Sequence, residues 1–246
     1  MKRLVQTILA KLGYRVQGIR YCPRQLLEPK NLRVVEFDDI VCRRMFEAGS
    51  QFTFIQVGAF DGVTKDPLQK YINRFGWRGV LIEPQADAVD KLRDLYRDNP
   101  RIVVLQAALD DRKGKRTLFR VASPKAPEWA GVLASFQRDT IAKHRDLIPD
   151  LEEMIVEDAV DCITFEDVFK ALPGKEVDLL QIDTEGADGK MISLFPFERV
   201  RPAIIHWEVK HLSTAEREQC LARLVSFGYR FAPSGEEDML AVLNNH

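Results

Sequence analysis

The chain has little cysteine and almost no net charge, and each shortage excludes a class of protein. Its 246 residues include four cysteines, none of which belongs to a C-x-x-C pair. That spacing argues against a zinc site and is consistent with a reducing compartment. The 36 lysines and arginines nearly balance the 37 aspartates and glutamates, so the formal net charge is −1. Nucleic acid is therefore not indicated as an electrostatic partner.

Long hydrophobic runs are also missing. No apolar stretch reaches the ~18 residues that a membrane-spanning helix requires. No signal-peptide pattern opens the chain either, because polar residues interrupt the apolar stretch 4–12. We therefore expect no membrane span and a cytoplasmic location.

Residues 1–50 are predicted to form a helical extension, separate from a domain that covers residues 51–246. Apolar residues recur at helical spacing within residues 4–12, and several lysines and arginines make this end basic. The pattern is typical of a helix that packs on the domain or on a second subunit of a homodimer. It also fits a basic amphipathic helix that makes peripheral contact with an anionic membrane. A second helix is expected at 38–48, ended by Gly49.

A short buried strand that runs into a glycine turn organises the rest of the chain. Residues 52–57 are apolar or aromatic apart from Thr53 and Gln56, and the run ends at Gly58. A short apolar run closed by glycine is typical of a central parallel strand. Gly58 and Gly62 let the backbone turn tightly and pass close to a ligand, where a Cβ would intrude. In a doubly wound sheet, this first turn is where a nucleotide-like cofactor binds.

Two further apolar runs end in acidic residues and predict one cleft. Residues 80–82 lead to Glu83, which follows Gly62 by about 20 positions, the offset at which an acid reaches ribose hydroxyls. Residues 179–182 lead to Asp183. The turn G-x-x-x-G lacks the third glycine of the dinucleotide fingerprint, which disfavours a nicotinamide oxidoreductase. The alternation of such runs with helical patterns predicts an α/β fold with a parallel sheet.

Five motifs follow one another from about residue 52 to the end of the chain. They are Val57-Gly58-Ala59-Phe60-Asp61-Gly62, Ile82-Glu83-Pro84, Leu133-Ala134-Ser135-Phe136 with Lys143-His144, Leu180-Gln181-Ile182-Asp183-Thr184-Glu185-Gly186, and Glu208-Val209-Lys210-His211. Together and in this order, they resemble the FkbM-type family of S-adenosylmethionine-dependent methyltransferases. The chain departs from the family pattern at two positions. Gln56 stands where many members have Asp, and Phe60 stands where Asn is usual.

The resemblance implies both a fold and a reaction. The fold is α/β, with a doubly wound, mostly parallel sheet of about seven strands, as in Rossmann-like class I methyltransferases. The final strand of such a sheet inserts antiparallel, which suits the predicted strand pair 229–232 and 239–243. The reaction is O-methylation of a hydroxyl on a sugar, polysaccharide or secondary metabolite, so the expected partner is a small-molecule or glycan acceptor.

The resemblance also implies which residues contact S-adenosylmethionine. Glu83 would accept hydrogen bonds from both ribose hydroxyls, and Asp61 or Gln56 would bind the ammonium group. Ala107 and Ala108 leave room for the flat face of adenine, although plain packing explains them equally well. The expected cofactor contacts are Gln56, Gly58, Phe60, Asp61, Gly62, Glu83, Pro84, Ala107, Ala108 and Asp183.

Polar residues at the ends of the later strands are the expected catalytic and acceptor-binding groups. Asp183 lies where the methyl group should be delivered, and it forms the predicted catalytic set with Glu208 and His211. By its pKa, His211 is the best general base of the three. The structural alternative for a buried Glu208 is a salt bridge to a lysine or arginine, and His144 could simply be solvated. The expected acceptor contacts are Ser135, His144 and Glu185.

Two alternatives remain, namely a site that binds a divalent metal ion and a module that has no catalytic activity. Carboxylates and a histidine would suit Mg²⁺ or Mn²⁺, but spacing alone does not establish such a site, so a divalent cation is left open and not expected. The chain could also be a methyltransferase-like module that binds without catalysing, within a glycan-assembly complex. Glu83 and Asp183 argue against this second alternative, whereas Gln56 and Phe60 leave it open.

Overall fold

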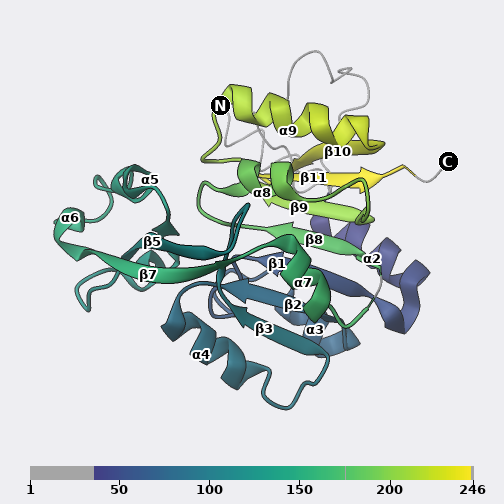
Figure 1. Cartoon of the computed structure of the whole chain (residues 1–246), viewed down its shortest axis with the longest axis horizontal. Helices are drawn as coiled ribbons and strands as arrows, with labels where there is room; N and C mark the ends of the chain where they lie inside the picture. The colour runs from purple at the N-terminus through teal and green to yellow at the C-terminus, as the bar shows by residue number, and fades with distance from the viewer. Residues whose placement is uncertain (1–35, 175, 245–246) are drawn as a thin grey trace, which may run out of the picture.

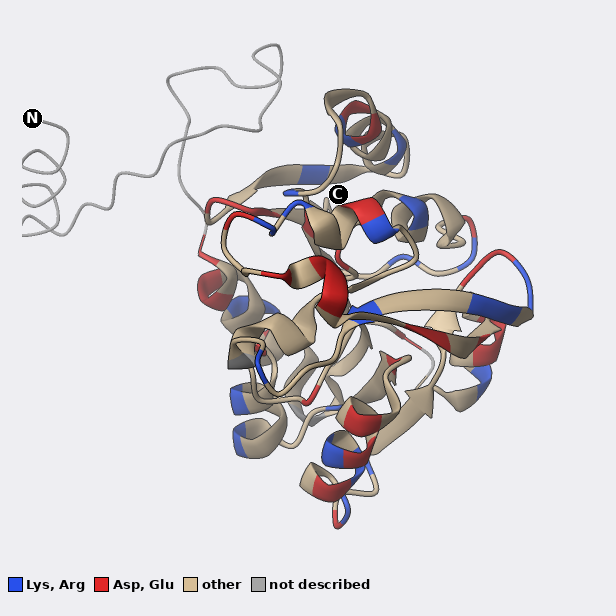
Figure 2. Cartoon of the chain, turned by 90° about the vertical axis from the view of Figure 1, so that its left-hand side faces the viewer, with Lys and Arg blue, Asp and Glu red and all other residues tan. Residues whose placement is uncertain are grey.

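The computed structural model describes residues 36–174 and 176–244 (Figure 1). The basic helix predicted within residues 4–12 lies outside the described residues. Among the helices that are described, none combines the length and the apolar character needed to cross a bilayer. Acidic and basic positions are interspersed over the ribbon, and neither charge gathers into one large region in the view of Figure 2.

A seven-stranded sheet forms the centre of the molecule (Figure 1). Its strands lie in the order β10-β11-β9-β8-β1-β2-β3. β11 runs antiparallel to both of its neighbours, whereas every other neighbouring pair in this sheet is parallel. The strands are β1 (Thr53–Val57), β2 (Arg78–Glu83), β3 (Ile102–Gln106), β8 (Leu179–Ile182), β9 (Ile204–Glu208), β10 (Tyr229–Ser234) and β11 (Asp238–Leu243). This arrangement confirms the predicted mostly parallel sheet with an antiparallel final strand.

Helices cover both faces of this sheet because successive strand residues point to opposite sides. On one face, Ile55, Leu180 and Trp207 share a core with α7, α8 and α9. On the other face, Phe54 and Leu179 share a core with α2, α3 and α4. The helices are α2 (Phe37–Ala48), α3 (Gln69–Phe75), α4 (Ala86–Leu95), α7 (Phe165–Ala171), α8 (Asp188–Leu194) and α9 (Thr214–Ser226). The central strands are therefore buried on both sides, as the apolar runs predicted.

Local sequence signals begin and end several of these helices, and α2 ends at the glycine predicted for it. α2 ends at Gly49, which has φ +60°. The Asp66 carboxylate accepts hydrogen bonds from backbone N–H groups at the start of α3, and Thr164 begins α7 with a capping box. α2 also buries Val41 and Met45 in the second core. This described part of the N-terminal extension therefore packs on the sheet.

A smaller sheet stands beside the carboxyl ends of the main strands, in the order β4-β7-β5-β6. β5 pairs antiparallel with β7 along its whole length, and Figure 1 shows β5, β7, α5 and α6 as an arm that extends away from the main sheet. The smaller sheet and its connections comprise β4 (Ala108–Leu109), β5 (Gly114–Val121), the 3₁₀ helix η3 (Glu128–Val132), β6 (Ala134–Ser135), α5 (Arg138–Ala142), α6 (Leu151–Met154) and β7 (Ile155–Ile163). Elsewhere, the 3₁₀ helix η2 (Gly49–Gln51) precedes β1. The sequence did not predict this second sheet, because β5 and its partner strand β7 lie far apart along the chain.

Candidate functional site

A cavity of about 280 Å³ lies at the carboxyl ends of the central strands. β1 and β8 are neighbours there, while the chain leads from β1 toward β2 and from β8 toward β9, in opposite directions across the sheet. Open α/β sheets bind their ligands at such a switch point. Ser135 at the end of β6 and Phe136 just after it line the cavity, as do Glu237 from the β10–β11 turn and Asp238 at the start of β11.

The turn after β1 brings the backbones of two strands into close approach. Gly58 has φ +80°, a left-handed conformation that favours glycine. A Cβ on this residue would lie 1.7 Å from the carbonyl oxygen of Asp183, at the end of β8. The N–H of Gly58 also donates to the carbonyl of Ile82 in β2, at 2.9 Å. Gly58 therefore joins the ends of three strands, which explains why the turn requires glycine here.

Phe60 adopts a left-handed conformation in the same turn, with φ +44°. Asn is enriched in this region of backbone space, whereas a bulky side chain is uncommon there. The conformation persists because the N–H of Phe60 donates to Oε2 of Glu83 at 2.9 Å. The cost is on the order of 1 kcal/mol, and an Asn at this position would adopt the conformation more readily.

Glu83 is a buried carboxylate that ties this turn to the end of β2. Its Oε2 accepts from Phe60 and its Oε1 accepts from the N–H of Gln85, both at 2.9 Å. The residue is 4% exposed. Burial raises the pKa of Glu83 to about 7, although the two N–H donors act in the opposite direction. A carboxylate has about four acceptor positions, so about two remain for a ligand in the cavity.

The loop after β8 presents Asp183 to the cavity. Withdrawal from bulk water into this recess, and then the nearby Glu185 carboxylate, raise the pKa of Asp183 to about 6. Asp188 fixes the loop through three hydrogen bonds. Its carboxylate accepts from the N–H groups of Thr184 and Gly186 at 3.3 Å and from the Thr184 hydroxyl at 3.0 Å. Burial raises the pKa of Asp188 to about 7. The loop is thus fixed by buried hydrogen bonds, which positions Asp183 at the strand end.

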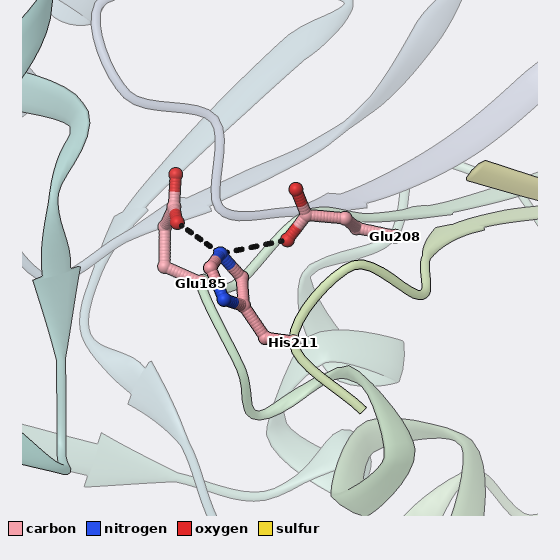
Figure 3. A group of neighbouring side chains, drawn as sticks. All are labelled: Glu185, Glu208 and His211. Atoms are coloured by element: carbon pink, nitrogen blue, oxygen red, sulfur yellow. Dashed lines mark hydrogen bonds and ion pairs between the residues drawn. The ribbon is translucent and has the colours of Figure 1, made fainter. Parts of the chain in front are cut away.

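Glu185, Glu208 and His211 converge beside the end of β9 (Figure 3). The Nε2 atom of His211 lies 3.0 Å from Oε2 of Glu185 and 3.7 Å from Oε2 of Glu208. Glu208 is 8% exposed, and its Oε2 makes no hydrogen bond. Burial, and then the neighbouring carboxylates, raise the pKa of Glu208 to about 10. Both glutamates line the cavity, whereas His211 is not among the lining residues and lies behind them.

Three polar side chains cross one face of the sheet next to the cavity. Gln56, Gln181 and His206 lie opposite one another on β1, β8 and β9. Burial lowers the pKa of His206 to about 4, so the neutral imidazole donates from Nδ1 to Oε1 of Gln181 at 2.8 Å. The Nε2 of Gln56 donates to Asp66 at 3.3 Å, but its buried Oε1 has no partner. Gln56 lines the cavity, and its Oε1 is a buried acceptor without a partner among the described residues.

Most of the residues predicted for the site line this one cavity, namely Gln56, Gly58, Phe60, Glu83, Pro84, Ala107, Ala108, Ser135, Asp183, Glu185 and Glu208. Asp61 is not among them, and its carboxylate accepts from backbone N–H groups two and three residues further along its own turn. Gly62 is also outside the lining, and a Cβ there would meet the Leu92 side chain at 2.7 Å. The His144 ring lies 6.2 Å from the His211 ring, outside the lining. The contacts predicted for Asp61, Gly62 and His144 stay predictions.

The structure also brings in residues that were not among the predicted cofactor, catalytic or acceptor contacts. Gln181 and Asp188 had a readable signal, since one is a glutamine inside an apolar run and the other an acid at a helix start. Asp238 had none, because it comes next to Glu208 only through the pairing of β11 with β9. Burial, and then Asp183, raise the pKa of Asp238 to about 7.

Comparisons with solved structures find several methyltransferases. One is the methyltransferase FkbM from Methylobacillus flagellatus KT, at 14% identity and a TM-score of 0.47, over 78% of this chain and 44% of that chain. Another is precorrin-6y C5,15-methyltransferase from Geobacter metallireducens GS-15, at 10% identity and 0.42, over 86% of this chain and 91% of that chain. A third is the ribosomal protein L11 methylase from Lactobacillus delbrueckii subsp. bulgaricus, at 8% identity and 0.42, over 84% and 78%.

A family model gives the decisive comparison. No match was found among curated proteins. The model of the methyltransferase FkbM domain, however, matches residues 56–231, which is more than half of the chain and includes the strands that form the cavity. This chain therefore belongs to the FkbM methyltransferase domain family.

Proposed function

We propose that this protein transfers the methyl group of S-adenosylmethionine to a hydroxyl of a sugar, polysaccharide or secondary metabolite. The observation that carries the proposal is the cavity at the switch point, where Glu83 and Asp183 from the two strands beside β1 line one space. Membership of a methyltransferase family supports methyl transfer. The cofactor and the class of acceptor are the parts that we add.

The lining residues suit S-adenosylmethionine, which supplies a methyl group on a positively charged sulfur when it is bound. Glu83 keeps acceptor positions for the ribose hydroxyls, and Gln56 offers its unpartnered Oε1 to an N–H donor such as an ammonium group. The lining holds two lysines and seven carboxyl groups, and even with Glu208 protonated, as its raised pKa implies, the acids outnumber the lysines and favour a cationic occupant. These carboxyl groups belong to Asp66, Glu83, Asp183, Glu185, Glu208, Glu237 and Asp238.

Asp183 is the proposed group that orients the acceptor hydroxyl and takes its proton. Its carboxylate opens into the cavity, and a pKa of about 6 keeps it ionised at and above neutral pH. Histidine is the side chain that most often acts as a general base, but the Nε2 of His211 faces Glu185 and Glu208. His211 would therefore reach the acceptor only through these carboxylates.

Calorimetric titration with S-adenosylhomocysteine at pH 8 tests the cofactor site. The wild-type protein should bind this ligand in the micromolar range and should not bind NADH. Glu83→Gln replaces one accepting oxygen with a donor NH₂ group, and the loss of a hydrogen bond to a charged group costs about 1.5–3 kcal/mol. Affinity should therefore fall about 10- to 100-fold. The matched control is Asp90→Asn on α4, where the carboxylate is 79% exposed, and it should bind like the wild type.

Two results would contradict this assignment. Equal affinity of the Glu83→Gln variant would remove Glu83 from the site, provided that its melting curve shows a folded protein. Absence of any S-adenosylhomocysteine binding would reduce the family relationship to one of fold. If the ligand binds but no hydroxyl acceptor is methylated from a labelled donor, the catalytically silent binding module becomes the better description.

A further inference from the structure

The three side chains in Figure 3 point to a ligand of another kind. We propose that Glu185, Glu208 and His211 form a binding site for a divalent cation, with Mn²⁺ as the best-fitting occupant. Spacing along the sequence does not establish such a site, because Glu185 lies on the loop after β8, whereas Glu208 ends β9 and His211 lies on the turn after it. The folded chain brings one donor atom of each side chain together.

The donor atoms have the spacing that an ion requires. Two ligands that are each about 2.1 Å from an ion and at a right angle to each other lie about 3.0 Å apart. The Nε2 of His211 lies 3.0 Å from Oε2 of Glu185 and 3.7 Å from Oε2 of Glu208. All three donor atoms lie within 4.8 Å of one another. Small side-chain rotations would therefore place all three around one ion.

Glu208 gives an independent indication that a partner belongs here. The residue is 8% exposed, and its Oε2 makes no hydrogen bond. Buried polar atoms in proteins are normally hydrogen-bonded or coordinate a metal, yet within residues 36–174 and 176–244 no lysine or arginine forms an ion pair with Glu208. A cation between Glu208 and Glu185 would satisfy the unpartnered oxygen and offset the repulsion between the two carboxylates.

The chemistry of the donors selects the class of ion. Carboxylate oxygens suit Mg²⁺ and Mn²⁺, and an imidazole nitrogen suits transition metals. Mn²⁺ accepts both kinds of donor. Three protein ligands leave about three positions of an octahedral ion open, and these would face the cavity because Glu185 and Glu208 line it. The positions would hold water or an oxygen of the acceptor, and only the latter role rests on the proposed function.

Electron paramagnetic resonance of added Mn²⁺ tests the site in untagged full-length protein without cofactor or acceptor. The wild-type protein should bind one Mn²⁺ saturably, and Glu185→Gln and Glu208→Gln should each weaken binding at least tenfold. Glu237→Gln is the matched control, since Glu237 lines the same cavity but is 53% exposed. The same loss of charge should change its affinity less than twofold.

The histidine ligand has its own spectroscopic signature. Spin-echo modulation of the bound Mn²⁺ should show a coupled nitrogen that disappears in His211→Gln and persists in His144→Gln, whose ring lies 6.2 Å from that of His211. Three results would overturn the proposal: no saturable binding by the folded wild type, equal affinity of the Glu208→Gln and Glu237→Gln variants, or no nitrogen coupling. Because the protein alone is tested, these results are independent of the titration with S-adenosylhomocysteine.

Discussion

Gly58→Ala is the substitution for which the structure makes its most quantitative prediction. An alanine at φ +80° pays about 1–2 kcal/mol for a left-handed backbone. Its Cβ would also lie 1.7 Å from the carbonyl oxygen of Asp183, whereas ordinary contacts begin at 3.4 Å. The strand ends must therefore separate by more than 1 Å.

That separation has its own cost. It would strain the hydrogen bond from the Asp183 N–H to the Val57 carbonyl, now 2.9 Å long, which contributes about 1 kcal/mol. Overpacking a tight site typically costs a further 1–3 kcal/mol or so. The free energy of unfolding should therefore fall by about 3–6 kcal/mol, a large part of the roughly 5–15 kcal/mol of a typical domain.

Urea unfolding of Gly58→Ala beside Gly235→Ala separates the two costs. Gly235 has nearly the same φ, +81°, but an added Cβ there meets nothing within 4 Å. The control should therefore lose only the backbone cost of about 1–2 kcal/mol. If both variants lose equal stability within about 0.5 kcal/mol, the close approach of β1 and β8 does not require glycine at position 58, and our account of this turn is wrong.

Two further predictions concern the acidic groups of the site. Between pH 6.5 and 8.5, Tm should fall as pH rises, because Glu83 and Asp188 have pKa values of about 7 and Glu208 of about 10. The folded state then holds more protons than the unfolded chain, and each extra proton changes stability by about 1.4 kcal/mol per pH unit. His206 has a lowered pKa of about 4 and therefore acts in the opposite direction, but only near and below its unfolded pKa of about 6.5. A Tm that stays flat or rises with pH in scanning fluorimetry would therefore contradict the raised pKa values. Asp183→Asn should lower methyl transfer to an accepted hydroxyl about 100-fold or more without lowering Tm, and near-normal turnover would exclude Asp183 from the reaction.

Local patterns were sufficient to predict the strands, the turn and the two acids that frame the cavity. Apolar runs closed by glycine or an acid predict β1, β2 and β8 because burial and turn geometry are decided by a few neighbouring residues. Glu83 and Asp183 could be placed at the carboxyl ends of these strands for the same reason. The reaction class came from the combination of motifs, since fold by itself does not specify chemistry.

Tertiary structure decided which of the predicted residues meet and how they ionise. Glu208 and His211 meet Glu185 only because β9 lies beside β8. Asp61 was predicted from its place in a motif, but its carboxylate faces its own turn. The raised pKa of Glu208 follows from burial and from carboxylates on other loops. Such long-range contacts depend on strand order and side-chain packing, which no stretch of neighbouring residues encodes.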